Sequence, residues 1–292
     1  MQHQELAERQ DGGRPGRGPV PRDDRVLLET RVVSLFIAPF LVLGFGILYL
    51  FPGHTRELFA WTIKPQMTAM MLGAAYLGGV YFFLRAATTP SWVSVQAGFP
   101  PVAVFATLLG LTTILHWDRF NHAHIAFITW TALYFTTPFL VAAVWIRNRA
   151  RDPHTATELD LPRPRTVGTV MVTVGVAVLA CAAFLFLRPD VAVQVWPWPL
   201  TPLTARVVAS LFALAGVAQV CTGLDPRWSA SRITLQSQLL SLAAIELAAA
   251  LSWADFRPAS PLRWTFAGGL LALLLAIGAL MVAMDRRRAT MR

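Results

Sequence analysis

The sequence has little charge, few cysteines and almost no lysine. Charged residues make up 14% of its 292 residues, and Lys64 is the single lysine. Soluble domains contain about 25% charged residues, so the composition excludes an ordinary soluble enzyme. The two cysteines, Cys181 and Cys221, lie in separate apolar runs, which excludes a small scaffold held together by disulfides.

Motifs that identify common enzyme classes are also absent. The sequence contains no glycine-rich phosphate loop, no G-x-S-x-G, no G-x-G-x-x-G and no acidic pair typical of a sugar-nucleotide or magnesium site. The longest connection between apolar runs is about 20 residues, which is too short for a soluble catalytic domain. We therefore predict no catalytic residue, and an enzyme is not the favoured interpretation.

What the sequence has instead is long apolar runs. Hydrophobic residues make up 55% of the chain. A helix of roughly 20 apolar residues crosses a bilayer, and in lipid such a run must form its own backbone hydrogen bonds. Runs of this kind occupy 32–51, 66–84, 100–117, 123–146, 167–187, 203–222, 233–253 and 264–284. The sequence predicts an all-α polytopic membrane protein with eight transmembrane helices.

The net charge of +9 predicts how the chain is oriented. If the N-terminus is cytoplasmic, most of the 25 Lys and Arg residues fall on the cytoplasmic side, as the positive-inside rule requires. We therefore expect a multi-pass protein of the plasma membrane with both termini in the cytoplasm. Because orientation accounts for the charge, the lipid bilayer is the expected partner and nucleic acid is not.

Rare residues recur at a nearly constant spacing, which predicts an internal repeat. At an offset of 137 the pairs are Pro52 and Pro189, Trp61 and Trp198, Pro65 and Pro202, and Gly79 and Gly216; at 136 they are Pro90 and Pro226, Trp92 and Trp228, and Trp117 and Trp253. Four spans in each half make the two repeats parallel. The predicted organisation is a disordered cytoplasmic tail at 1–30, one four-span repeat at 31–147, a cytoplasmic linker at 148–166, a second four-span repeat at 167–284 and a basic cytoplasmic tail at 285–292.

Each half carries a W-x-x-x-P motif on the outer rim, before its second span. The residues are Trp61 and Pro65 in the first half, and Trp198 and Pro202 in the second. Tryptophan anchors a helix at the headgroup level, and proline is favoured at the start of a helix. These residues are therefore interpreted as anchors or, alternatively, as paired outer gates.

Polar residues at membrane depth are the candidates for binding or coupling a solute. Glu246 lies within the seventh span, and Arg206 enters the sixth span from the same face. A buried charge requires a partner, so we expect a Glu246–Arg206 ion pair. The alternatives are a carboxylate that faces a cavity and couples protons or cations, and a lipid-headgroup contact. Gln219 on the sixth span, with Gln236 and Gln238 on the seventh, extends this polar path or forms interhelical hydrogen bonds.

Three histidines, His116, His122 and His124, cluster at the turn between the third and fourth spans. Imidazole groups bind zinc, copper and iron, so a metal or haem site on the outer rim is one hypothesis. Their spacing matches no established ligand pattern, so ordinary interfacial polarity is the main interpretation. No cofactor is predicted.

The strings FAWTIKPQMTA (59–69) and HWDRF (116–120) resemble those of bacterial multi-span membrane proteins of unknown function. The resemblance covers the second to fourth spans at most. It implies no activity, cofactor or site.

These observations together predict a transporter- or permease-like protein that handles a small or lipidic solute between its two repeats. Glu246 and Arg206 would bind or couple, and Trp61 and Trp198 would stand at the outer gate. Two alternatives stay open. One is a membrane metal- or haem-binding protein that uses the outer histidines, and the other is a structural subunit that binds a membrane partner or a second copy of itself.

Overall fold

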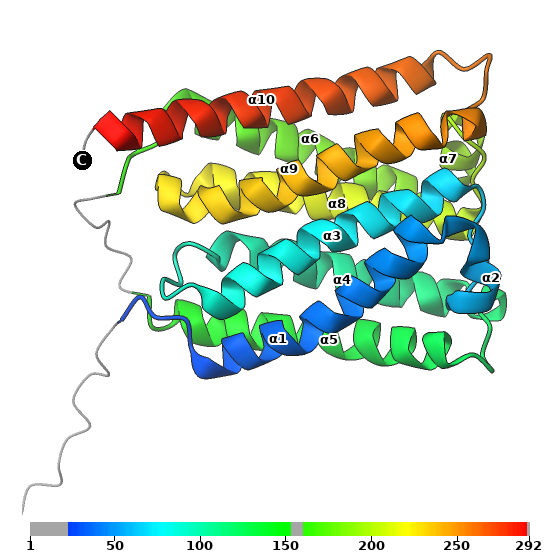
Figure 1. Ribbon diagram of the computed structural model, residues 1–292, viewed down its shortest axis with the longest axis horizontal. Helices are drawn as coiled ribbons and strands as arrows, with labels where there is room; N and C mark the ends of the chain where they lie inside the picture. The colour runs from blue at the N-terminus through cyan, green and yellow to red at the C-terminus, as the bar shows by residue number, and fades with distance from the viewer. Residues whose placement is uncertain (1–22, 153–159, 291–292) are drawn as a thin grey trace, which may run out of the picture.

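The computed structural model describes residues 23–152 and 160–290, and this part of the chain is almost entirely helical (Figure 1). Eight of its helices are long and apolar enough to cross a membrane, so the predicted multi-pass, all-α class is confirmed. The spans are α1 (Leu28–Phe45) with its π-helical end η1 (Gly46–Leu50), α3 (Gln66–Thr88), α4 (Phe99–Leu115) preceded by η3 (Gln96–Gly98), α5 (Ile125–Arg149), α6 (Arg165–Leu187), α8 (Pro202–Leu224), α9 (Trp228–Leu251) and α10 (Leu262–Thr290). The short helices are η2 (Pro52–His54), α2 (Thr55–Leu58), η4 (Trp117–Arg119), α7 (Pro189–Val195) and η5 (Trp253–Asp255).

The spans extend beyond the predicted ranges where polar contacts hold their ends. The last helix continues to Thr290, through most of the range predicted as a basic tail. Asp285 accepts hydrogen bonds from the guanidinium of Arg232 at 3.1 Å and from the indole N–H of Trp228 at 3.3 Å. These bonds fasten the extension of α10 to α9, so the helix does not end where its apolar run ends.

The segments before α1 and α6 are also bonded to the bundle. The amide of Val26 donates to the carbonyl of Pro90 at 3.0 Å, and the amide of Arg163 donates to the carbonyl of Pro226 at 2.8 Å. Residues 23–30, within the range predicted as a disordered tail, are therefore ordered, and α1 begins at Leu28. The remainder of that predicted tail, 1–22, lies outside the described residues, as do 153–159 of the predicted linker and 291–292.

The eight spans form two layers of four antiparallel neighbours (Figure 1). One layer has the order α10, α9, α3, α1, and the other has the order α6, α8, α4, α5. The layers touch where α8 meets α3 and α9 and where α1 meets α5. The central helices α3 and α8 are the most buried spans, and the edge helices α10 and α6 are the least buried. Both described termini lie at one end of the bundle, which we call the terminal end; α2 and α7 lie at the distal end.

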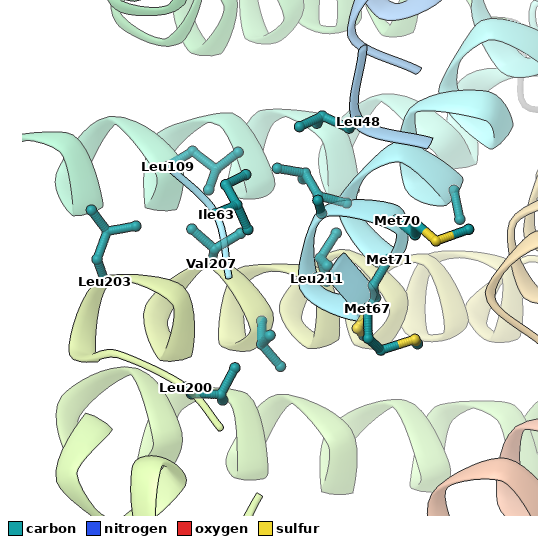
Figure 2. Packing of buried hydrophobic residues seen from close by; sticks show 14 of the residues in the cluster. Leu48, Ile63, Met67, Met70, Met71, Leu109, Leu200, Leu203, Val207 and Leu211 are labelled. Carbon is teal, nitrogen blue, oxygen red and sulfur yellow. The ribbon is translucent and has the colours of Figure 1, made fainter. Parts of the chain in front are cut away.

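One large cluster of buried hydrophobic residues lies where the two layers meet near the distal end (Figure 2). Met67, Met70 and Met71 of α3 lie in one buried cluster with Leu203 and Val207 of α8. Methionine side chains are flexible and fill irregular gaps. This packing holds α3 against α8 and so joins the two layers at the distal end.

Candidate functional site

The two layers border a partly open cavity of about 270 Å³, to which all eight spans contribute. Its lining includes Ala215 and Gln219 of α8, Thr234, Ser237, Gln238 and Ser241 of α9, Tyr76 of α3 and Tyr134 of α5. The rest of the lining is mainly apolar, and it contains no Asp, Glu, Lys, Arg or His among the described residues. Such a cavity accommodates an uncharged molecule, because an isolated charge there would lose its hydration without gaining a partner.

Two pairs of polar side chains lie in the wall of this cavity. The hydroxyl groups of Tyr76 and Tyr134 are hydrogen-bonded at 2.6 Å. The side-chain amide of Gln219 donates to the amide oxygen of Gln238 at 3.3 Å. The Gln238 amide nitrogen then has no partner, and a buried N–H without a partner is costly in free energy.

A close approach between α3 and α9 brings the hydroxyl residues to the cavity. The hydroxyl of Ser237 donates to the carbonyl of Gly78 at 2.8 Å. A Cβ atom at Gly78 would overlap Ser241 Oγ and lie 2.7 Å from the carbonyl oxygen of Ser237. Glycine is therefore required at this position, and the contact fixes which face of α9 lines the cavity.

Sequence reasoning predicted Gln219 and Gln238 as polar-path residues but did not identify Thr234, Ser237 or Ser241. The structure places Gln238 in the cavity wall, whereas Gln236 lies elsewhere and accepts a hydrogen bond from the Tyr81 hydroxyl at 2.6 Å. Thr234, Ser237, Gln238 and Ser241 are spaced i, i+3, i+4 and i+7, which places them on one helix face. This spacing is the sequence signal that could have identified a polar face on α9.

Glu246 and Arg206 do not form the predicted ion pair. Glu246 lies one turn beyond Leu242, on the side of α9 that packs with α10, and its Oε1 has no hydrogen-bond partner. Arg206 instead donates to Nε2 of His116 at 2.7 Å, and its guanidinium lies 5.9 Å from the ring centroid of Phe186. The two side chains therefore belong to different helix contacts, and neither lines the cavity.

The Arg206–His116 contact joins α8 to the end of α4 near the distal end. Since a guanidinium only donates, His116 Nε2 is the acceptor and the ring is neutral in this contact. The pKa of His116 is lowered, first by burial and then by the positive charge of Arg206, while Asp118 opposes the shift. Both of the main causes favour the unprotonated ring that the hydrogen bond requires.

The three histidines have separate contacts and are not brought together. His124 Nδ1 accepts the amide of Ala126 at 3.1 Å and so caps α5. The ring of His122 lies 4.7 Å from that of Phe127, edge to face, and His116 contacts Arg206. Within residues 23–152 and 160–290, no group of three His, Cys, Asp or Glu side chains is arranged to hold a metal.

The rim residues Trp61 and Trp198 are buried in aromatic clusters. The ring centroid of Trp61 lies 4.8 Å from that of Trp130, and that of Trp198 lies 5.0 Å from that of Phe256. Pro65 directly precedes α3, and Pro202 is the first residue of α8. All four residues position helix ends at the distal end of the bundle, and they do not line the cavity.

No protein-family model, no curated protein and no solved structure matches this chain. The cavity between the layers is therefore the feature that points to a function.

Proposed function

We propose that this membrane protein binds a small, largely apolar solute in the cavity between its two layers and acts as a transporter or permease for it. The cavity carries this proposal, because helices from both halves of the chain meet around one uncharged space. Its volume of about 270 Å³ is just below the range of small-molecule pockets, about 300–1,000 Å³. A solute in this position would contact every span, so that movement of one layer against the other would change its access.

The proposal includes two parallel four-span repeats. Contacts in the first half that have counterparts 136 or 137 residues later support it. The backbone bridge between Arg25 and Ser91 has a counterpart between Pro162 and Arg227, shifted by 137 and 136 residues. The helix contacts agree with the same shift: α1 with α3 corresponds to α6 with α8, and α3 with α9 corresponds to α8 with α4. A pseudo-twofold axis between α3 and α8 accounts for both observations, and the cavity lies at the interface of the repeats.

Arginines that bind carbonyl oxygens at the ends of two equivalent helices support the same arrangement. Arg31 donates to the carbonyls of Ala87 and Thr89 at 2.6 and 2.8 Å, where α3 ends. Arg163 donates to the carbonyls of Gly223 and Asp225 at 2.9 and 3.0 Å, where α8 ends. The accepting carbonyls are 136 residues apart in both cases, although the arginines come from different positions. Cations are favourable at helix C-termini.

The orientation belongs to the proposal too. We propose that the terminal end of the bundle faces the cytoplasm of a plasma-membrane protein, because the positive-inside rule places the arginine-rich ends there. Arg147 and Arg149 at the end of α5, Arg165 at the start of α6 and Arg287 near the end of α10 all lie on this side. Labelling of intact cells by a membrane-impermeant thiol reagent tests it with Thr290→Cys and His54→Cys, each in the C181S/C221S background: His54→Cys should react, and Thr290→Cys should react only after permeabilisation.

The solute-binding proposal is tested by filling the cavity. Ala215 lines the cavity and is exposed to it, so Ala215→Phe adds bulk without overpacking the core. Ala183 is exposed on α6 away from the lining, so Ala183→Phe is the matched control. Mass spectrometry of molecules that co-purify with the intact chain should find one retained by the unmodified protein and by the control variant and lost from Ala215→Phe. Uptake of that molecule into proteoliposomes then tests transport. If all three proteins carry the same molecules in equal amounts, the cavity is not the binding site.

A further inference from the structure

Five polar positions in the cavity wall break the proposed repeat. Gln219, Thr234, Ser237, Gln238 and Ser241 all belong to α8 and α9, in the second half. The positions 136 or 137 residues earlier are Phe82, Gly98, Pro101, Val102 and Phe105, which also line the cavity. At these five positions the two halves are alike in backbone arrangement and opposite in polarity, while the first half contributes its own polar pair, the hydrogen-bonded hydroxyls of Tyr76 and Tyr134, elsewhere in the wall.

The polar side lies toward the terminal end. Gln219 is five residues before the end of α8, and Thr234 and Gln238 lie in the first half of α9, which starts at the same end. Each residue of a helix advances about 1.5 Å, so Gln219 lies roughly 8 Å inside the end of its span. The polar groups therefore sit inside the apolar part of the bundle and not at its surface.

Hydrogen-bonding capacity on this side is incomplete. Gln238 uses its amide oxygen for Gln219, while its amide nitrogen and the Thr234 hydroxyl have no partner. The last torsion of a glutamine side chain is soft, so a turn of this amide would present its N–H to the cavity in exchange for the long 3.3 Å bond from Gln219. A ligand with a hydrogen-bond acceptor would satisfy it.

We propose that the cavity binds one uncharged amphiphile, whose carbonyl-type acceptor is hydrogen-bonded by Gln238 and whose apolar body lies along the phenylalanine-lined side. Ionic headgroups do not fit, because no described residue in the lining carries a charge. A pure hydrocarbon would leave the amide without a partner. This inference rests on the proposed function and adds to it the chemical class and the direction of the ligand.

The test compares three probes of equal chain length: 2-undecanone, undecane and undecanoate. Binding to the full chain in lipid nanodiscs is followed by native mass spectrometry and by the rise in unfolding temperature. We expect the ketone to bind about fivefold more tightly than undecane, since a net hydrogen bond contributes about 1 kcal/mol, and undecanoate to bind more weakly than either.

Two glutamine variants identify the donor. Gln238→Met keeps the size of the side chain and removes the amide, so the preference for the ketone should fall to less than about twofold. Gln236→Met, on the same helix but bonded to Tyr81 outside the cavity, should keep the full preference. The comparison of probes on the unmodified chain does not depend on either variant folding.

The outcomes separate this inference from the proposed function. If undecane binds as tightly as the ketone and Ala215→Phe abolishes both, the acceptor site is refuted while the cavity remains a solute site. The acceptor site is equally refuted if undecanoate binds best, or if Gln236→Met removes the preference as fully as Gln238→Met. If no probe binds in an Ala215-dependent way, both proposals fail.

Discussion

Trp198 donates its indole N–H to the hydroxyl of Thr68 at 2.9 Å, and both side chains are buried. The bond joins the loop before α8 to the first turn of α3, and therefore one layer to the other. Thr68→Val keeps the shape of the side chain and leaves the indole without an acceptor. We expect the free energy of unfolding in detergent to fall by about 1–3 kcal/mol.

The control for this prediction is Thr107→Val. Thr107 is exposed on α4, and its hydroxyl donates only to a carbonyl of its own helix, that of Ala103 at 2.8 Å. Its replacement should change the unfolding free energy by less than about 0.5 kcal/mol. Equal effects of the two substitutions would contradict the role given to the Trp198–Thr68 bond.

In the proposed repeat the counterpart of Trp198 is Trp61, and it lacks such a bond, which gives a second prediction. The indole nitrogen of Trp61 is buried without a partner, and the position that corresponds to Thr68 is Ala205. Ala205→Ser supplies an acceptor there, so the unfolding free energy should stay the same or rise by up to about 1 kcal/mol. In a Trp61→Phe background the same serine should be destabilising. A loss of stability in both backgrounds would argue against the proposed equivalence of the two sites.

Gly78 gives the third prediction, through the contact between α3 and α9. Gly78→Ala forces its Cβ against Ser241 Oγ and the Ser237 backbone, and backbone does not give way as a flexible side chain does. We expect a loss of about 1–3 kcal/mol in unfolding free energy. Gly268→Ala, on α10 with nothing within 4 Å of the new methyl group, should be neutral or stabilising by up to about 1 kcal/mol. If the two substitutions change the unfolding free energy equally, α3 and α9 do not pack as closely at Gly78 as in the structure.

The eight spans could be predicted from the sequence, but which spans pack against one another could not. In lipid every backbone polar group must be bonded within its helix, so an apolar run such as 167–187 becomes a helix whatever its β-propensity. Hydropathy does not say which helix faces which. The Glu246–Arg206 prediction used the depth of each residue and lacked its direction around the helix axis, which the packing of α9 on α3 and α10 determines. The polar face formed by Thr234, Ser237 and Ser241 follows from their spacing. Whether this face borders a cavity depends on the close contact at Gly78 and on the opposite layer, which the sequence does not reveal.

Protonation of His116 gives the fourth prediction. Its pKa is lowered in the fold, chiefly by burial and next by Arg206, so the unfolded chain binds this proton more readily. The contribution of His116 to stability is therefore complete above the unfolded pKa of about 6.5 and decreases as the pH falls below it. The unfolding temperature should drop between about pH 7.5 and pH 5, and His116→Gln should make that drop smaller.

His54→Gln, at an exposed position, is the control and should leave the drop unchanged. An identical pH profile for His116→Gln and the unmodified chain would count against the Arg206–His116 contact.

A pair of double-mutant cycles distinguishes the observed partner of Arg206 from the one expected from sequence. Arg206 bonds His116 at 2.7 Å, whereas Glu246 Oε1 has no partner. Residues in contact show coupling energies of about 0.5–3 kcal/mol, and residues without shared contacts are additive within about 0.5 kcal/mol. With Arg206→Met, His116→Ala and Glu246→Gln, the Arg206–His116 cycle should therefore show coupling at neutral pH and the Arg206–Glu246 cycle should show none. Because Glu246→Gln keeps the size of the side chain and removes its charge, a strong coupling in the second cycle would mean that the two groups meet as an ion pair after all, and would restore Glu246 and Arg206 as one site.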